Sequence, residues 1–202
     1  MPLAISFELS DHDLEYFEKA ILAAREAAGE INQDAVIAAA GKLLVDSHQQ
    51  VLPEFIASRL AHLDALIAMV RDEGWALSDE DRQRVVSALV YFAEPMDIIP
   101  DHVPVLGYFD DAIAIELCVR ELKHELDSYA EFCDFRQGEA DRRGMSPASV
   151  GRAAWLDSRR DELQERMHRR RERDYGTGYG KSSGYAREGY TSSWRPGLLR
   201  VR

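Results

Sequence analysis

The stretch "EPMDIIPDHVPVLGYFDD", residues 94–111, decides the fold. Three prolines, four aspartates and a glycine lie here among Ile, Val, Leu, Tyr and Phe, in a sequence otherwise rich in helix formers. Each proline disfavours helix at the residue before it, so the preceding helix must end, and the glycine can adopt a positive φ and turn the chain. The residues that set this break are Pro95, Pro100, Pro104 and Gly107. The stretch predicts a helical hairpin with a proline-stiffened apex.

Apolar residues recur at spacings of three and four on both sides of this break, which is the pattern of amphipathic helices. The helix at 33–52 is expected to bury Val36, Ala40, Leu43 and Val51. Ser10 with Asp13 is a capping pair that opens the first helix, and Gly29 is its expected stop. The helices are expected near residues 10–28, 33–52, 53–74 and 78–93, with a long helix from Asp110 past Cys133.

The fold class is therefore all-α. About five helices form a bundle around the Pro/Asp hairpin, followed by a charged helix and a disordered tail. Residues 1–145 are the expected helical domain, with the hairpin signature at about 82–122.

The C-terminal quarter differs in character from the rest. Ser146-Pro147 is a cap followed by a proline at the first helical position. The Arg-rich helix that follows, residues 146–174, has only a thin apolar stripe of Leu156, Leu163 and Met167, which predicts a solvated or partner-seeking extension. Residues 175–202 are rich in Gly, Tyr and Arg without apolar periodicity, so they are expected to be disordered.

Charge separates the two ends of the chain. Residues 1–150 hold 12 basic and 29 acidic side chains, whereas residues 151–202 hold 13 basic and 7 acidic ones. The acidic part repels phosphates and is not expected to bind nucleic acid. The basic end can contact phosphates or fold back on the acidic body, and the sequence leaves both open.

The cysteines and the lack of a long apolar segment indicate where in the cell the protein is expected. Cys118 and Cys133 fall on one expected helix, roughly 22 Å apart, which is beyond the reach of about 7 Å for a disulfide. A reducing compartment follows as the simplest interpretation. No stretch of about 18 uncharged apolar residues is present, and the N-terminus resembles no signal peptide. A cytoplasmic protein, peripheral to the inner membrane if it contacts one, is expected.

The hairpin also carries a family resemblance. "YFAEPMDIIPDHVPVLGYFDDA" resembles the signature of the YkvA family, a bacterial family also known as domain of unknown function 1232. The matching positions are Pro95, Asp97, Ile99, Pro100, Asp101, Pro104, Gly107, Asp110 and Asp111. The resemblance covers about 40 residues. The family has no established activity, and its members are often described as membrane proteins.

The four signature aspartates have two possible roles, one structural and one in metal binding. Asp beside Pro commonly closes turns, and Asp at a helix start caps the backbone, so structure alone explains each residue. Alternatively, clustered carboxylates recruit a divalent cation such as Mg²⁺, Mn²⁺ or Ca²⁺. The candidate metal ligands are Asp97, Asp101, Asp110 and Asp111.

These observations give a first hypothesis of a non-enzymatic interaction or adaptor module, because no nucleophile with an identified base is found. Its partner is an unidentified protein or a membrane surface that contacts the apolar apex. The alternative is a metal-dependent phosphoester hydrolase that uses the aspartates. A third hypothesis is weak RNA binding through residues 175–202, where Arg alternates with aromatic side chains.

Overall fold

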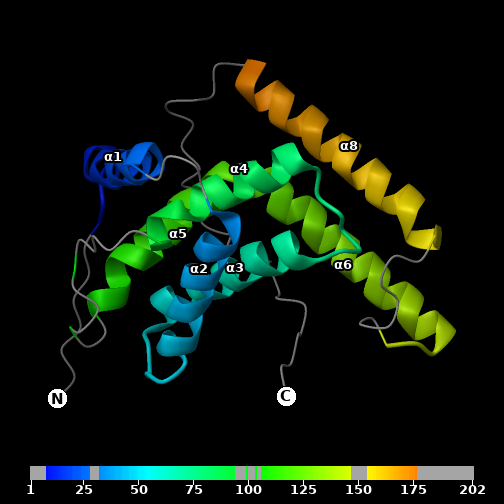
Figure 1. Cartoon of the computed structure of the whole chain (residues 1–202), viewed down its shortest axis with the longest axis horizontal. Coiled ribbons are helices and arrows are strands. Elements are labelled where there is room, and N and C mark those ends of the chain that lie inside the picture. The colour runs from blue at the N-terminus through cyan, green and yellow to red at the C-terminus, as the bar shows by residue number, and fades with distance from the viewer. Residues whose placement is uncertain are drawn as a thin grey trace. The chain divides into compact units, whose positions relative to one another are not determined.

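The computed structural model of the chain describes residues 8–27, 32–93, 99, 103, 106–146 and 154–176. Every regular element in these ranges is a helix, which confirms the all-α class (Figure 1). None of the described helices is long and apolar enough to cross a bilayer. The elements are α1 (Asp11–Ala27), α2 (Gln33–Ser47), α3 (Glu54–Arg71), α4 (Asp79–Leu89), η1 (Val90–Ala93), η2 (Leu106–Tyr108), α5 (Phe109–Glu121), α6 (Lys123–Arg143) and α8 (Ala154–Gly176).

The chain divides into two compact units. The first comprises Met1–Ile67 and Glu80–Glu121, and the second comprises Ala68–Asp79 and Leu122–Arg202. The domain limits expected from the sequence, with a boundary at residue 145, stay a prediction. So does disorder in the tail, because residues 177–202 lie outside the described ranges.

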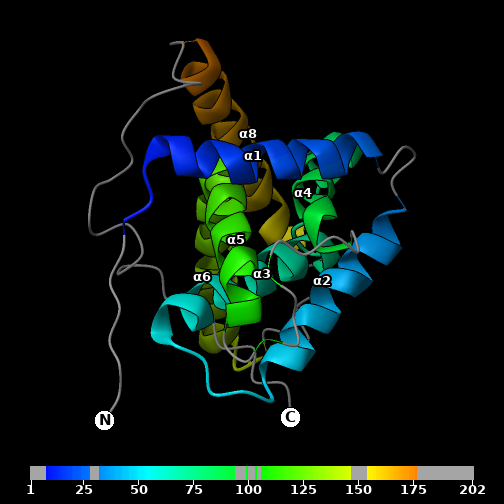
Figure 2. The same ribbon diagram turned by 90° about the vertical axis from the view of Figure 1, so that its left-hand side faces the viewer.

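In the first unit, α1 packs against α5 and η1 (Figure 2). Apolar side chains on one face of α1 cover the buried surface of these elements, as their spacing of three and four predicts. The cluster consists of Ile21, Tyr91, Ile113, Ala114 and Leu117, with Leu14, Phe17, Ala20, Phe92 and Phe109 packed against it.

Both ends of α1 are fixed by polar contacts. At its start, the Ser10 N–H donates to Asp13 at 2.9 Å and the Asp13 N–H donates to Ser10 Oγ at 3.4 Å, which confirms the capping pair. The hydrogen bonds from Ser10 hold the pKa of the Asp13 carboxyl below its usual value. Near its end, Arg25 donates to the Ser87 carbonyl at 3.0 Å and pairs with Glu121 at 2.6 Å. The expected stop at Gly29 lies outside the described residues.

The second helix is shorter than the sequence predicts. It ends at Ser47 rather than Leu52, and Val51, expected in the core, is 97% exposed. The Ser47 hydroxyl donates to the Leu44 carbonyl at 2.7 Å, and the Gln50 N–H closes a turn onto the Ser47 carbonyl at 3.1 Å. Such local side-chain bonds compete with the helical pattern, so the chain leaves the helix before Val51 can turn inward.

The long helix expected after the hairpin is divided into two. α5 ends at Glu121, α6 begins at Lys123, and Leu122 between them has φ −102° and ψ 22°. No glycine or proline lies nearby, so no local signal in the sequence marks this break. Both cysteines are free thiols, as expected.

In the second unit, α8 packs against α6. The expectation of a solvated extension is therefore wrong, since all three residues of the apolar stripe, Leu156, Leu163 and Met167, are fully buried. Ion pairs from α8 to α6 join Arg166 to Glu131 and Arg171 to the buried Glu125. Three apolar residues were too few to indicate a packed helix. In the structure these residues and the two ion pairs together hold α8 against α6.

A core substitution tests the packing of α8. Leu163→Ala should lower the free energy of unfolding by about 3 kcal/mol, because it removes a fully buried side chain and leaves a cavity. The matched control is Leu22→Ala on α1, where the leucine is 53% exposed, and its loss should stay below about 1 kcal/mol. Urea unfolding measures both. An equally small loss for the two variants would mean that α8 is solvated.

Candidate functional site

The centre of the signature segment is the buried side chain of Asp110, in the first turn of α5. Its Oδ2 atom accepts the N–H of Ile99 at 3.0 Å and faces the hydroxyl of Tyr91 at 3.4 Å. Ile99 belongs to the connection before α5, and Tyr91 belongs to η1 before that connection. A single carboxylate thus joins the two sides and the middle of the helical hairpin.

This arrangement differs from a helix cap. α5 begins at Phe109, so Asp110 and Asp111 both lie inside its first turn, where negative charge also favours the helix dipole. A buried carboxylate must find hydrogen-bond donors, since an unpaired one would cost several kcal/mol. Asp110 meets this need with donors from residues 11 and 19 positions earlier in the chain. The side chain therefore fixes the path of the connection.

The turn into α5 also differs from the expected one. Gly107 lies buried in η2, a 3-10 helix, and its N–H donates to the Val103 carbonyl at 2.9 Å. Among the described glycines a positive φ is found at Gly144, at the end of α6, and not at Gly107. The prediction of a left-handed backbone at Gly107 is therefore wrong. The remaining motif residues, Pro95, Asp97, Pro100, Asp101 and Pro104, lie outside the described residues.

The four-aspartate metal site stays a prediction for the same reason. Asp110 and Asp111 are described, whereas the other two expected ligands are not. In the described ranges, no group of three or more His, Cys, Asp or Glu side chains is arranged to hold a metal ion.

Exposed apolar side chains gather at the end of the first unit where α5 begins. Val51 is 97% exposed, Leu106 is 57% exposed and Phe55 is 40% exposed. The α2–α3 connection and η2 are joined by a hydrogen bond from Gln50 to the Tyr108 hydroxyl at 3.3 Å. The rings of Phe55 and Phe109 also lie 5.8 Å apart. We call Val51, Phe55 and Leu106 the apolar tip; Figure 2 shows the α2–α3 connection and the start of α5 at the same end.

Polar side chains support the apolar tip from α3 and α5. Arg59 stacks 4.2 Å over the Phe55 ring and pairs with Glu116 at 3.3 Å. His62, one turn further along α3, is buried. Burial lowers the pKa of the His62 imidazole, against the opposing field of Glu116, so this side chain favours its neutral form. Phe55 is thus held in place by side chains of α3 and α5.

The two thiols are placed to stay protonated. Cys118 is buried in α5 and its Sγ donates to the Ala88 carbonyl at 3.0 Å. Burial raises the pKa of the Cys118 thiol to about 12, and burial also raises the pKa of Cys133. Because the thiolate is the nucleophile, neither environment activates a cysteine.

Comparisons with known proteins find a family match in the signature segment. The family model for "Protein of unknown function (DUF1232)" matches residues 84–117, which run from α4 through the connection into α5. The chain is also similar to "Uncharacterized membrane protein YkvA" of Bacillus subtilis (strain 168). The two sequences are 33% identical over 79 residues, which is 36% of this chain and 73% of the relative. No solved structure matches the chain.

Removing the charge of Asp110 should destabilise the protein. Asp110→Asn should lower the free energy of unfolding by about 1–3 kcal/mol, because two donors lose a charged acceptor. Asp111→Asn, the same change at the next residue, is the control and should cost less. Thermal melting with and without Mg²⁺, Mn²⁺ or Ca²⁺ measures both effects. A cation-dependent stabilisation of about 2.7 kcal/mol that Asp110→Asn abolishes would contradict a purely structural role.

Alkylation tests the thiols. At pH 9 an ordinary thiol is about half ionised, whereas a Cys118 thiol with a pKa of about 12 remains protonated. Iodoacetamide should therefore modify Cys118 on the order of a hundredfold more slowly in the native protein than in urea, as followed by mass spectrometry of peptides. Equal rates in both conditions would show an accessible, ionised thiol.

Proposed function

The chain belongs to the YkvA family of proteins of unknown function (DUF1232), and we propose that it is a non-enzymatic interaction module that contacts a membrane surface peripherally. The observation that carries this proposal is the apolar tip, which presents Val51, Phe55 and Leu106 to solvent at one end of the first unit. The relative from Bacillus subtilis is described by its name as a membrane protein. An interfacial lipid layer is the occupant that suits aliphatic and aromatic side chains of this kind.

The chemistry of the tip favours shallow and reversible contact. Full burial of one such side chain contributes about 1.5–3 kcal/mol, and two of the three are already partly covered. The sum is a few kcal/mol, which is enough for partition to a surface and too little for permanent anchoring. The supporting ring contact and the Gln50–Tyr108 hydrogen bond hold the tip in place before binding, so little ordering cost remains.

A binding role also agrees with how the reactive groups are used. The signature carboxylate of Asp110 is occupied by hydrogen bonds within the hairpin. Burial keeps the Cys118 thiol protonated, and both cysteines are free, as is usual in a reducing compartment. We therefore place the contact on the cytoplasmic side of the membrane.

Flotation with phosphatidylcholine vesicles tests the contact. These lipids carry no net charge, so the acidic character of the first unit does not repel them. The wild type should float with the vesicles, and Leu106→Asp should reduce its partition about tenfold, because a charged group replaces an exposed apolar one.

The matched control is Leu22→Asp. Leu22 is 53% exposed, close to the 57% of Leu106, but it lies on α1, away from the tip (Figure 2). It should float like the wild type. A wild type that remains at the bottom at low salt would reject membrane contact, and an equal loss in both variants would reject the tip as its site.

A further inference from the structure

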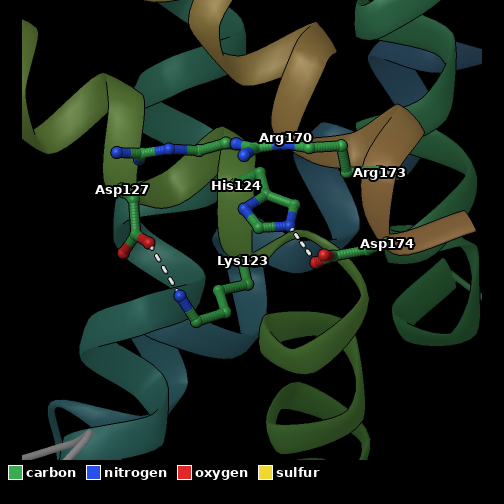
Figure 3. Close-up of a pocket in the computed structure, with 6 residues that line it drawn as sticks. All are labelled: Lys123, His124, Asp127, Arg170, Arg173 and Asp174. Atoms are coloured by element: carbon green, nitrogen blue, oxygen red, sulfur yellow. Dashed lines mark hydrogen bonds and ion pairs between the residues drawn. The ribbon is translucent and has the colours of Figure 1, made fainter. Parts of the chain in front are cut away.

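The second unit contains a charged hollow where the start of α6 meets the end of α8. Its volume is about 500 Å³, and it is lined by Lys123, His124, Asp127, Arg170, Arg173 and Asp174 (Figure 3). We call this hollow the basic pocket. Three of the six lining groups are Lys or Arg side chains and two are carboxylates, so the formal charge at neutral pH is positive.

Both carboxylates have polar contacts within the pocket. Asp127 accepts from the Lys123 ammonium at 3.0 Å, one helical turn away on α6. Asp174 contacts His124 Nε2 at 2.5 Å and so connects the end of α8 to α6. Figure 3 shows these two contacts along the wall, while the side chains of Arg170 and Arg173 extend from α8 over the pocket. With Asp127 offset by Lys123, the two guanidinium groups outweigh the single negative charge of Asp174.

The arginines of α8 differ in what they contact, and Arg173 donates from Nε to the Arg169 carbonyl at 3.3 Å within the helix. Arg166 and Arg171 form ion pairs with Glu131 and Glu125 and fix α8 to α6. Arg170 has no hydrogen bond or ion pair with any described residue, and its side chain is only partly buried. Arg173 lies three residues further along, so both side chains reach the same face of the helix. The pocket is thus built on a helix that is already held in place.

From this geometry we infer that the basic pocket binds a phosphate monoester or polyphosphate group. A guanidinium presents a planar fork that matches two phosphate oxygens, and a pair of forks with a nearby ammonium suits a group with three free oxygens. The inference does not depend on the proposed membrane contact, since the pocket and the apolar tip share no residue.

Two sources can supply such a group: a small phosphorylated molecule or the headgroup of phosphatidic acid. Isothermal titration with pyrophosphate at constant ionic strength tests the free anion. Flotation with phosphatidylcholine vesicles that contain phosphatidic acid, compared with phosphatidylcholine alone, tests the lipid. Binding of pyrophosphate without a preference for phosphatidic acid assigns a free ligand, whereas a preference that pyrophosphate competes away assigns the headgroup.

Neighbouring arginines give a matched pair of variants. Arg170→Gln should weaken pyrophosphate binding, or the phosphatidic acid preference, about tenfold or more, because it removes charged hydrogen bonds. Arg169→Gln makes the same change of charge one residue away, at a side chain that pairs with Glu165 and does not line the basic pocket. It should weaken binding less than about twofold.

Circular dichroism of both variants confirms that the helices are intact. Absence of binding to pyrophosphate together with no preference for phosphatidic acid would overturn the inference. So would an equal loss in the two variants, which would indicate general attraction to the basic helix rather than a site.

Discussion

The first unit depends on a carboxylate that cannot reach water. Asp110 is buried in the first turn of α5, and a charge in that position is tolerated only where donors surround it. The donors come from the N–H of Ile99 and the hydroxyl of Tyr91. The connection between η1 and α5 must therefore return to the helix that carries the aspartate. Prolines in this segment limit the alternatives, because they restrict the residues before them.

The apolar tip follows from the same constraint. With α5 held against η1, η2 places Tyr108 inside the unit, where Gln50 donates to its hydroxyl, and leaves Leu106 outside. The α2–α3 connection lies at the same end of the unit as the start of α5, and Val51 in this connection is exposed. Membrane contact is thus proposed at the place where the signature segment meets a connection that lies far from it in sequence.

The second unit uses a carboxylate in a comparable way. Asp72 pairs with Arg136 at 2.7 Å, accepts the Tyr129 hydroxyl at 3.0 Å, and accepts the N–H groups of Gly74 and Trp75. Burial raises the pKa of the Tyr129 hydroxyl, which keeps it a donor. The turn after α3 is fixed to α6 by this side chain, and Gln164 of α8 adds a bond to the Trp75 carbonyl at 2.7 Å.

Short patterns in the sequence predicted the features that depend on interactions between neighbouring residues, such as helix caps and the apolar faces of helices. The capping pair of Ser10 and Asp13 and the apolar face of α1 were found because spacing and hydrogen-bond chemistry act within one helix. The exposure of Val51 was missed because α2 ends at Ser47, before the chain reaches Val51. The burial of α8 was missed because its ion pairs to α6 join residues 35 and 46 positions apart.

The aspartates and the glycine drew attention to the segment that the family model matches. The contacts of Asp110 could not be predicted, because they are made across the hairpin. The basic pocket was not found, although the sequence showed an Arg-rich helix. Which arginines anchor the helix and which face the hollow is decided by α6, and no spacing along α8 alone separates them.

Amide hydrogen exchange of Ile99, followed by NMR, tests the central claim most directly. The Ile99 N–H donates to Asp110, so its exchange should be slow in the wild type and in the neighbouring variant Asp111→Asn. In Asp110→Asn it should be faster, on the order of tenfold or more, because the charged acceptor is gone. The same fast rate in all three proteins would contradict the account, since Asp110 would then not hold the connection.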